Sequence, residues 1–179
     1  MLEIRFHGRG GHGVKTAADM LAYALMKKGK YVQAFPEFGP ERRGAPVRSF
    51  VRIDDKEIKT HETVTNPDIV VVFDDSLDPE DFVEGLDNKD ILLINSKKKD
   101  KFKFDTKTYS IDATGIAFDI LGVNIVNTIM LSALCAVAKL DVFEELKGMV
   151  YNHFNLKKGK DIADKNVKAM EIAYEKMKK

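Results

Sequence analysis

The chain of 179 residues has one cysteine, no tryptophan and no long run of apolar side chains. Cys135 has no second cysteine with which to form an intramolecular disulfide, and one thiolate cannot hold an iron–sulfur cluster, which takes about four. Because no stretch of about eighteen apolar residues is present, we predict no membrane-spanning helix. The first residues lack the charged and then apolar layout of a signal peptide, so we expect a cytoplasmic protein.

The chain also lacks an excess of charge of either sign. The 29 lysines and arginines nearly balance the 28 aspartates and glutamates, which leaves a formal net charge of +1. Such a balance gives no bulk attraction to nucleic acid or to an anionic membrane surface. Hydrophobic residues make up 44% of the chain and charged residues 32%, an ordinary globular composition. The length predicts a single domain over residues 1–179.

Hydrophobic patterns predict an α/β fold of the Rossmann-like kind. We expect an open, mostly parallel twisted sheet with flanking helices and an antiparallel hairpin. The predicted strands cover residues 2–7, 31–35, 47–53, 68–73, 91–95 and 108–111. The predicted helices cover residues 14–28, 113–121, 125–138, 141–151 and 161–179, with a further helix starting at Asp78.

Three segments carry more specific expectations. Residues 47–53 alternate in polarity and reach a turn at Asp54, so we predict a hairpin with a second strand around residues 57–61. The lysine-rich residues 97–107 are predicted to be an exposed excursion. Residues 125–138 are apolar nearly all round, which predicts a helix buried on several sides, in part by a subunit interface.

A glycine-rich loop between the first strand and the first helix is the strongest functional signal. Four glycines in six residues let the backbone approach a ligand closely, and the first amides of the next helix favour an anion such as phosphate. Gly8, Gly10 and Gly13 match the spacing of a dinucleotide fingerprint. The candidate ligand-binding residues of this loop are Gly8, Arg9, Gly10, Gly11, His12 and Gly13.

The rest of the dinucleotide fingerprint is missing. The second strand ends without the acidic residue that would hold ribose hydroxyls, since Glu37 lies beyond a proline. This weakens the prediction of a nicotinamide or flavin site. The alternative is that the glycines only allow tight packing of strand and helix.

A second loop, over residues 36–46, contains three prolines and two glycines around Arg42 and Arg43. This pair could contact phosphates or carboxylates of a partner. Asp74 and Asp75 follow a predicted parallel strand, where open α/β sheets place ligands. The four histidines have no metal-binding spacing, and we predict neither a metal site nor a complete catalytic site on this chain.

Several of these segments together resemble a known family. HGRGGHGVKTAADMLA, YVQAFPEFGPERRGAPVRSFVRID, NPDIVVVFDDSL, DATGIA and VNTIMLSALCAVA follow one another along the chain. In this order they are similar to the γ subunit of 2-oxoacid:ferredoxin oxidoreductases, and QAFPEFGPERRGAP is closest to the pyruvate branch. Two departures are His12, where the family commonly has glutamine, and Ser132, where it often has glycine.

The resemblance implies a multi-subunit enzyme that converts pyruvate and coenzyme A to acetyl-CoA and CO2 while reducing ferredoxin, or runs in reverse. It implies thiamine diphosphate between the α and β subunits and iron–sulfur clusters on the β and δ subunits. For this chain it implies a place beside the thiamine diphosphate site, in association with coenzyme A. Our hypothesis is that Gly8–Gly13 forms a phosphate-directed loop, in which Arg9, Arg42 or Arg43 assists coenzyme A binding or docks against another subunit. Two alternatives stay open: a stand-alone dinucleotide-binding protein and a purely structural assembly subunit. Within the family, 2-oxoisovalerate or 2-oxoglutarate could replace pyruvate.

Overall fold

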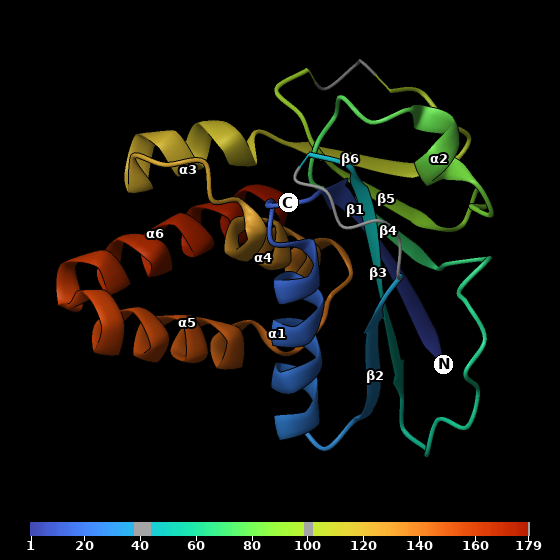
Figure 1. Cartoon of the computed structure of the whole chain (residues 1–179), viewed down its shortest axis with the longest axis horizontal. Coiled ribbons are helices and arrows are strands. Elements are labelled where there is room, and N and C mark those ends of the chain that lie inside the picture. Colours follow the sequence, from blue (N-terminus) through green and yellow to red (C-terminus); the bar gives the residue numbers. More distant parts are fainter. Residues whose placement is uncertain (38–43, 99–101, 179) are drawn as a thin grey trace.

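The computed structural model describes residues 1–37, 44–98 and 102–178, and its strands form a six-stranded sheet (Figure 1). The strands are β1 (Leu2–Arg9), β2 (Tyr31–Pro36), β3 (Pro46–Asp54), β4 (Ile69–Val72), β5 (Ile91–Asn95) and β6 (Lys107–Ile111). The helices are α1 (Val14–Lys27), α2 (Pro79–Val83), α3 (Ala113–Leu121), α4 (Asn127–Val137), α5 (Phe143–Lys158) and α6 (Lys160–Met177). These bounds lie close to the predicted ones for most elements.

The strand order in the sheet is β2-β3-β1-β4-β5-β6. Strands β1, β4, β5 and β6 pair in parallel, whereas β3 runs antiparallel to both β1 and β2. This confirms the prediction of a mostly parallel α/β sheet. The unit β1-α1-β2 is present, but β3 is inserted between its two strands.

The predicted hairpin partner of β3 is wrong. Residues 57–61 form no strand, because both edges of β3 are already occupied by β1 and β2. Residues 55–67 instead cross the face of the sheet, where polar side chains hold their carbonyl groups. Gln33 Nε2 donates to the carbonyl of Ile58 at 3.2 Å, and Arg52 Nη2 donates to the carbonyl of Glu62.

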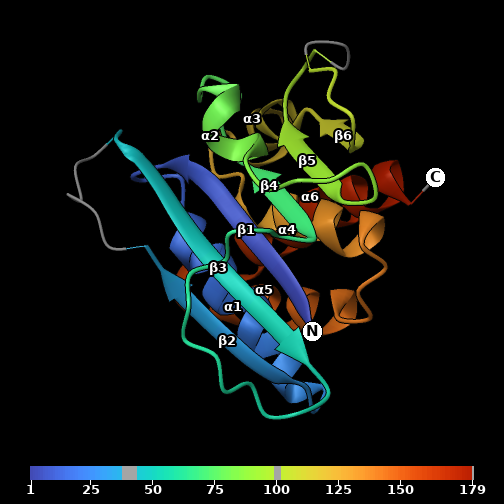
Figure 2. The ribbon, with the colours of Figure 1, turned by 90° about the vertical axis from the view of Figure 1, so that its right-hand side faces the viewer.

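The two faces of the sheet are covered differently. Helices α1, α3, α4, α5 and α6 lie together on one face, while α2 and residues 55–67 lie on the other (Figures 1 and 2). The larger core, around Phe6, Leu21 and Leu134, fills the helix-covered side. A smaller core around Val70, Phe82 and Leu92 lies under α2.

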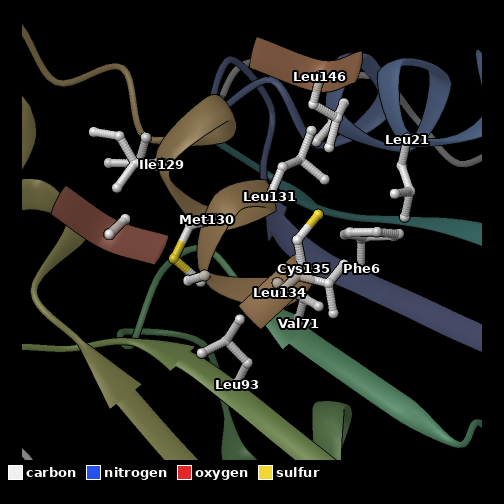
Figure 3. Close-up of a cluster of buried hydrophobic side chains, with 14 of the residues drawn as sticks. Phe6, Leu21, Val71, Leu93, Ile129, Met130, Leu131, Leu134, Cys135 and Leu146 are labelled. Carbon is white, nitrogen blue, oxygen red and sulfur yellow. The ribbon is translucent and has the colours of Figure 1, made fainter. Parts of the chain in front are cut away.

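Helix α4 lies at the centre of the larger core. Nine of its residues, from Thr128 to Ala136, are buried, and α1, α3, α5 and α6 all pack against it (Figure 3). The chain's own helices therefore bury these residues of α4, for which the sequence predicts a contribution from a subunit interface. Cys135 lies in this helix, as predicted for a structural thiol, and burial raises the pKa of the thiol to about 12.

The lysine-rich segment is less exposed than predicted. Residues 99–101 lie outside the described residues, but Phe102 and Phe104 pack against Phe82 with ring centroids 5.9 and 6.1 Å away. Phe102 is buried as a result. Because the segment is rich in lysine, its composition predicts exposure and does not indicate that two of its aromatic side chains belong to the smaller core.

Helix α4 ends on a lysine in the left-handed conformation, at a position where glycine is usual. Lys139 has φ 52°, and Leu140 N–H donates to the carbonyl of Cys135 at 3.0 Å, as in a Schellman motif. We expect Lys139→Gly to raise the free energy of unfolding by about 0.5–1 kcal/mol, since glycine has no Cβ to strain. Chemical denaturation measures the change. Lys139→Ala keeps the Cβ, so an equal gain in that variant would contradict the assignment to strain.

Candidate functional site

The glycine loop lies at the carboxyl end of β1 and is fixed by backbone hydrogen bonds. His12 N–H donates to the carbonyl of Arg9 at 3.0 Å, which closes a turn. Gly10 N–H donates to the carbonyl of Ala45 at 2.9 Å, and Gly44 N–H donates to the carbonyl of Gly10 at 3.1 Å. The structure thus brings the end of the second predicted loop against the first. Arg42 and Arg43 of that loop lie outside the described residues.

The glycines of the loop serve two different purposes. A Cβ on Gly8 would lie 2.5 Å from Val14 Cγ2, and a Cβ on Gly13 would lie 2.9 Å from the Asn127 side chain. These two glycines allow close packing of β1, α1 and α4. A Cβ on Gly11 would meet no atom within 4 Å among the described residues, and Gly11 has φ 100°. Gly11 therefore borders open space and needs glycine for its backbone conformation.

Helix α1 begins directly at this open space. Its N-cap is Gly13 with φ 74°, and no described side chain caps the helix. The first bond of the helix runs from Ala17 N–H to the carbonyl of Gly13 at 2.9 Å. An uncapped helix start leaves amides and the positive end of the helix dipole available to an anion.

Arg9 connects the glycine loop to the two neighbouring segments. Its Nε donates to Asp74 Oδ2 at 3.1 Å, its Nη2 to Ser76 Oγ at 3.0 Å and its Nη1 to the carbonyl of Gly44 at 3.1 Å. Sequence reasoning placed Arg9 and Asp74 in the same region without pairing them. The available signal was that Arg9 ends β1 and Asp74 follows β4, and these two strands are parallel neighbours. The guanidinium is thus held in position by the protein, and its side chain stays about one-third exposed.

Asp74 is the anionic centre of these contacts. Burial raises the pKa of its carboxyl, but hydrogen bonds from the Ser76 N–H and hydroxyl, with the charges of His12 and Arg9, lower the pKa further than burial raises it. The net pKa is below its ordinary value, so Asp74 is ionised at neutral pH. It balances Arg9 and leaves the loop without a strong net charge.

His12 lies beside Asp74 without a hydrogen bond to it. His12 Nδ1 is 3.9 Å from Asp74 Oδ2, and this buried nitrogen has no hydrogen-bond partner among the described residues. The side chain as a whole is 31% exposed. The imidazole thus borders the loop, close enough to contact a bound group.

Helix α3 begins at the same edge of the sheet, but its first backbone N–H groups already donate to side chains of the protein. Asn95 Oδ1 accepts from Ala113 N–H at 3.0 Å and from Thr114 N–H at 3.2 Å, and Asp112 accepts from Gly115 N–H at 2.7 Å. Sequence reasoning predicted the Asp112 cap but missed Asn95. Since these caps occupy the amides of α3, the start of α1 is the better place for an anion.

A separate hollow of about 800 Å³ lies between the start of α5 and the end of α6. Lys147 in it pairs with Glu144 and Glu171 at 3.1 Å each, and the rings of Phe143 and Tyr174 stack at 4.0 Å. These contacts hold the two helices together. Because the side chains of this hollow are engaged in joining α5 to α6, we take the glycine loop as the candidate site.

Within the described residues, no group of three or more histidine, cysteine, aspartate or glutamate side chains is arranged to hold a metal ion. The described helices also include none that is long and apolar enough to cross a membrane.

Residues 3–176 match the family described as pyruvate ferredoxin/flavodoxin oxidoreductase. The chain belongs to this family. It is 49% identical over 180 residues to pyruvate synthase subunit PorC of Methanocaldococcus jannaschii, covering 100% of this chain and 98% of the relative. It is 46% identical over 183 residues to the pyruvate/ketoisovalerate oxidoreductases common subunit gamma of Thermococcus kodakarensis, covering 98% and 97%.

Two solved structures have the same fold as this chain. The crystal structure of pyruvate oxidoreductase subunit PORC from Thermotoga maritima gives a TM-score of 0.85 at 41% identity, over 97% of this chain and 95% of that one. The 2-oxoglutarate:ferredoxin oxidoreductase of Magnetococcus marinus shares the fold, with a TM-score of 0.77 at 21% identity over 99% of this chain and 31% of that one. These findings confirm the predicted γ-type subunit of an oxidoreductase complex, over the alternative of a stand-alone dinucleotide-binding protein.

Proposed function

We propose that this chain is the γ subunit of a pyruvate:ferredoxin oxidoreductase and that its glycine loop holds a phosphate group of coenzyme A. The enzyme would convert pyruvate, coenzyme A and oxidised ferredoxin to acetyl-CoA, CO2 and reduced ferredoxin, reversibly. Thiamine diphosphate and the iron–sulfur clusters belong to the α, β and δ subunits in this proposal. The uncapped start of α1, facing open space at Gly11, is the observation that carries the coenzyme A site.

Each residue of the loop has a separate role in the proposal. Gly8 and Gly13 allow close packing of β1, α1 and α4, and Gly11 provides backbone facing the phosphate. Gly10 fixes the loop through its backbone bonds to Gly44 and Ala45. Arg9, held by Asp74 and Ser76, keeps the loop in shape. His12 contacts the bound group through its exposed edge. Arg42 and Arg43 would assist as further cations.

A second candidate keeps the same site but widens the substrate range. The relative from Thermococcus kodakarensis is named as a common subunit of pyruvate and ketoisovalerate oxidoreductases. A γ subunit without a 2-oxoacid site of its own can serve several substrates, because the 2-oxoacid would be recognised on other subunits. Assays of the purified complex with pyruvate, 2-oxoisovalerate and 2-oxoglutarate distinguish the two candidates.

The coenzyme A site is tested by a charge change at His12. We expect His12→Glu in the assembled complex to raise KM for coenzyme A at least tenfold, since a carboxylate beside the loop repels phosphate, which costs about 1.4 kcal/mol of binding. The kcat and the KM for pyruvate stay unchanged. His12→Gln, which adds no charge, is the matched control and is expected to stay within about twofold, below 0.5 kcal/mol.

The same experiment separates the coenzyme A site from a purely structural role. A structural subunit predicts that His12→Glu changes only the yield of assembled complex, with an unaltered KM for coenzyme A in the complex that forms. That result would remove the proposed phosphate site while leaving the family membership intact.

A further inference from the structure

Strand β2 is an edge of the sheet and has no charged side chain. It pairs with β3 along one side, and Figure 2 shows it as the outermost strand of the sheet. All six of its residues are at least partly exposed, whereas five of the nine residues of β3 are buried. Natural sheets usually protect such an edge with charges or bulges, because unpaired backbone groups invite another strand.

The backbone groups that face this free edge follow from the register. Glu37 N–H donates to the carbonyl of Arg48 at 3.0 Å, which continues the antiparallel ladder of β2 and β3. Hydrogen-bonded pairs alternate along such a ladder, so the N–H and C=O groups of Gln33 and Phe35 point toward β3. Those of Val32 and Ala34 point outward, and no described strand pairs with them.

We propose that β2 pairs antiparallel with β2 of a second copy of this chain, in the register that centres on Gln33. In that register Val32 lies opposite Ala34 of the second copy, and Ala34 lies opposite Val32 of the second copy. The outward N–H and C=O groups then form four hydrogen bonds, two in each pair. The arrangement is closed by a two-fold axis, as in most homodimers.

The side chains fit the same register. Tyr31, which is 51% exposed, lies opposite Phe35 of the second copy on the same face of the joined sheet. Pro36 has no N–H and falls opposite Lys30 of the second copy, so the ladder stops there. Helix α1 packs against β2 and exposes two more large apolar side chains, Tyr23 and Met26. The other edge strand, β6, begins with the exposed charge of Lys107.

A cysteine at the two-fold axis tests both the partner and the register. Gln33 lies opposite itself in a non-hydrogen-bonded pair, where Cβ atoms come close enough for a disulfide. We expect Gln33→Cys to form a disulfide-linked dimer under mild oxidation at least tenfold faster than Tyr31→Cys, whose opposite residue is Phe35. Buried Cys135 does not interfere. The reaction is followed on the full chain alone and in the assembled complex.

A second variant removes one of the outward donors. Ala34→Pro deletes an edge-facing N–H and leaves the β2–β3 hydrogen bonds in place, so we expect at least tenfold weaker self-association in sedimentation experiments. Ala34→Ser keeps the N–H and is the control. Equal cross-linking of Gln33→Cys and Tyr31→Cys, cross-linking of Gln33→Cys to a different subunit, or a chain that stays monomeric at all concentrations would each overturn the proposal.

Discussion

Replacing Arg5 with leucine is expected to lower the free energy of unfolding by about 3–5 kcal/mol, measured by chemical denaturation. Arg5 is 2% exposed, on the face of β1 opposite the larger core. Its Nε donates to His7 Nε2 at 2.9 Å, and its guanidinium donates to the carbonyls of Thr65, Phe82 and Glu84. Leucine leaves two buried acceptors, His7 Nε2 and the carbonyl of Phe82, without this donor, and it also removes the part-buried bonds to Thr65 and Glu84. The end of α2 then loses its hydrogen bonds to the sheet.

Arg48 provides a matched comparison on the adjacent strand. It lies opposite His7 in the register and pairs with Glu37, but its side chain is 39% exposed. A half-exposed ion pair contributes little to the free energy of unfolding, so we expect Arg48→Leu to lower that free energy by less than about 1 kcal/mol. Equal losses in the Arg5 and Arg48 variants would show that burial of the guanidinium is not the source of the effect.

Acid is expected to destabilise the protein through His7. Burial, followed by the charges of Arg5 and Arg48, lowers the pKa of His7 from 6.5 to about 3. Between these two pH values the imidazole of His7 binds a proton in the unfolded chain but not in the folded chain. The contribution of His7 to the free energy of unfolding is therefore fully present above pH 6.5 and is lost as the pH drops. At pH 4 the loss is about 3 kcal/mol relative to pH 7.5.

The variant His7→Gln isolates this contribution. Glutamine does not titrate, and its side-chain oxygen can still accept the hydrogen bond from Arg5 Nε. We expect the stability difference between the wild type and His7→Gln to shift by about 3 kcal/mol in favour of the variant from pH 7.5 to pH 4. Parallel unfolding curves for the two proteins over that range would contradict a buried neutral imidazole. The carboxylates common to both proteins cancel in this comparison.

Local structure could be predicted well because its causes are local. The periodicity of residues 14–28, the Asp78 and Asp112 caps and the buried runs at 68–73 and 91–95 all depend on neighbours along the chain. Strand order depends on contacts between distant residues. The alternating pattern of β3 does not indicate that this strand lies between β1 and β2. For this reason the sequence predicted a hairpin strand at residues 57–61 that the structure does not have.

The candidate site was predicted in part for the same reason. The glycine loop and its place before α1 followed from residues adjacent in sequence. The contacts of Arg9 with Asp74 and Ser76 join residues about 65 positions apart, and no local pattern encodes them. The buried contact of Arg5 with His7 was not predicted, because polar alternation along a strand is typical of a solvent-exposed face, whereas residues 55–67 and α2 cover that face of β1.

Hydrogen exchange of the assembled complex, with and without coenzyme A, tests the central claim most directly. If the loop holds a phosphate of coenzyme A, coenzyme A at a concentration near its Kd for the wild-type complex slows amide exchange in residues 10–16, at the start of α1. At the same concentration, His12→Glu removes most of that protection, because its site is largely empty. If coenzyme A protects peptides of other subunits while exchange in residues 10–16 stays unchanged, the glycine loop is not its binding site.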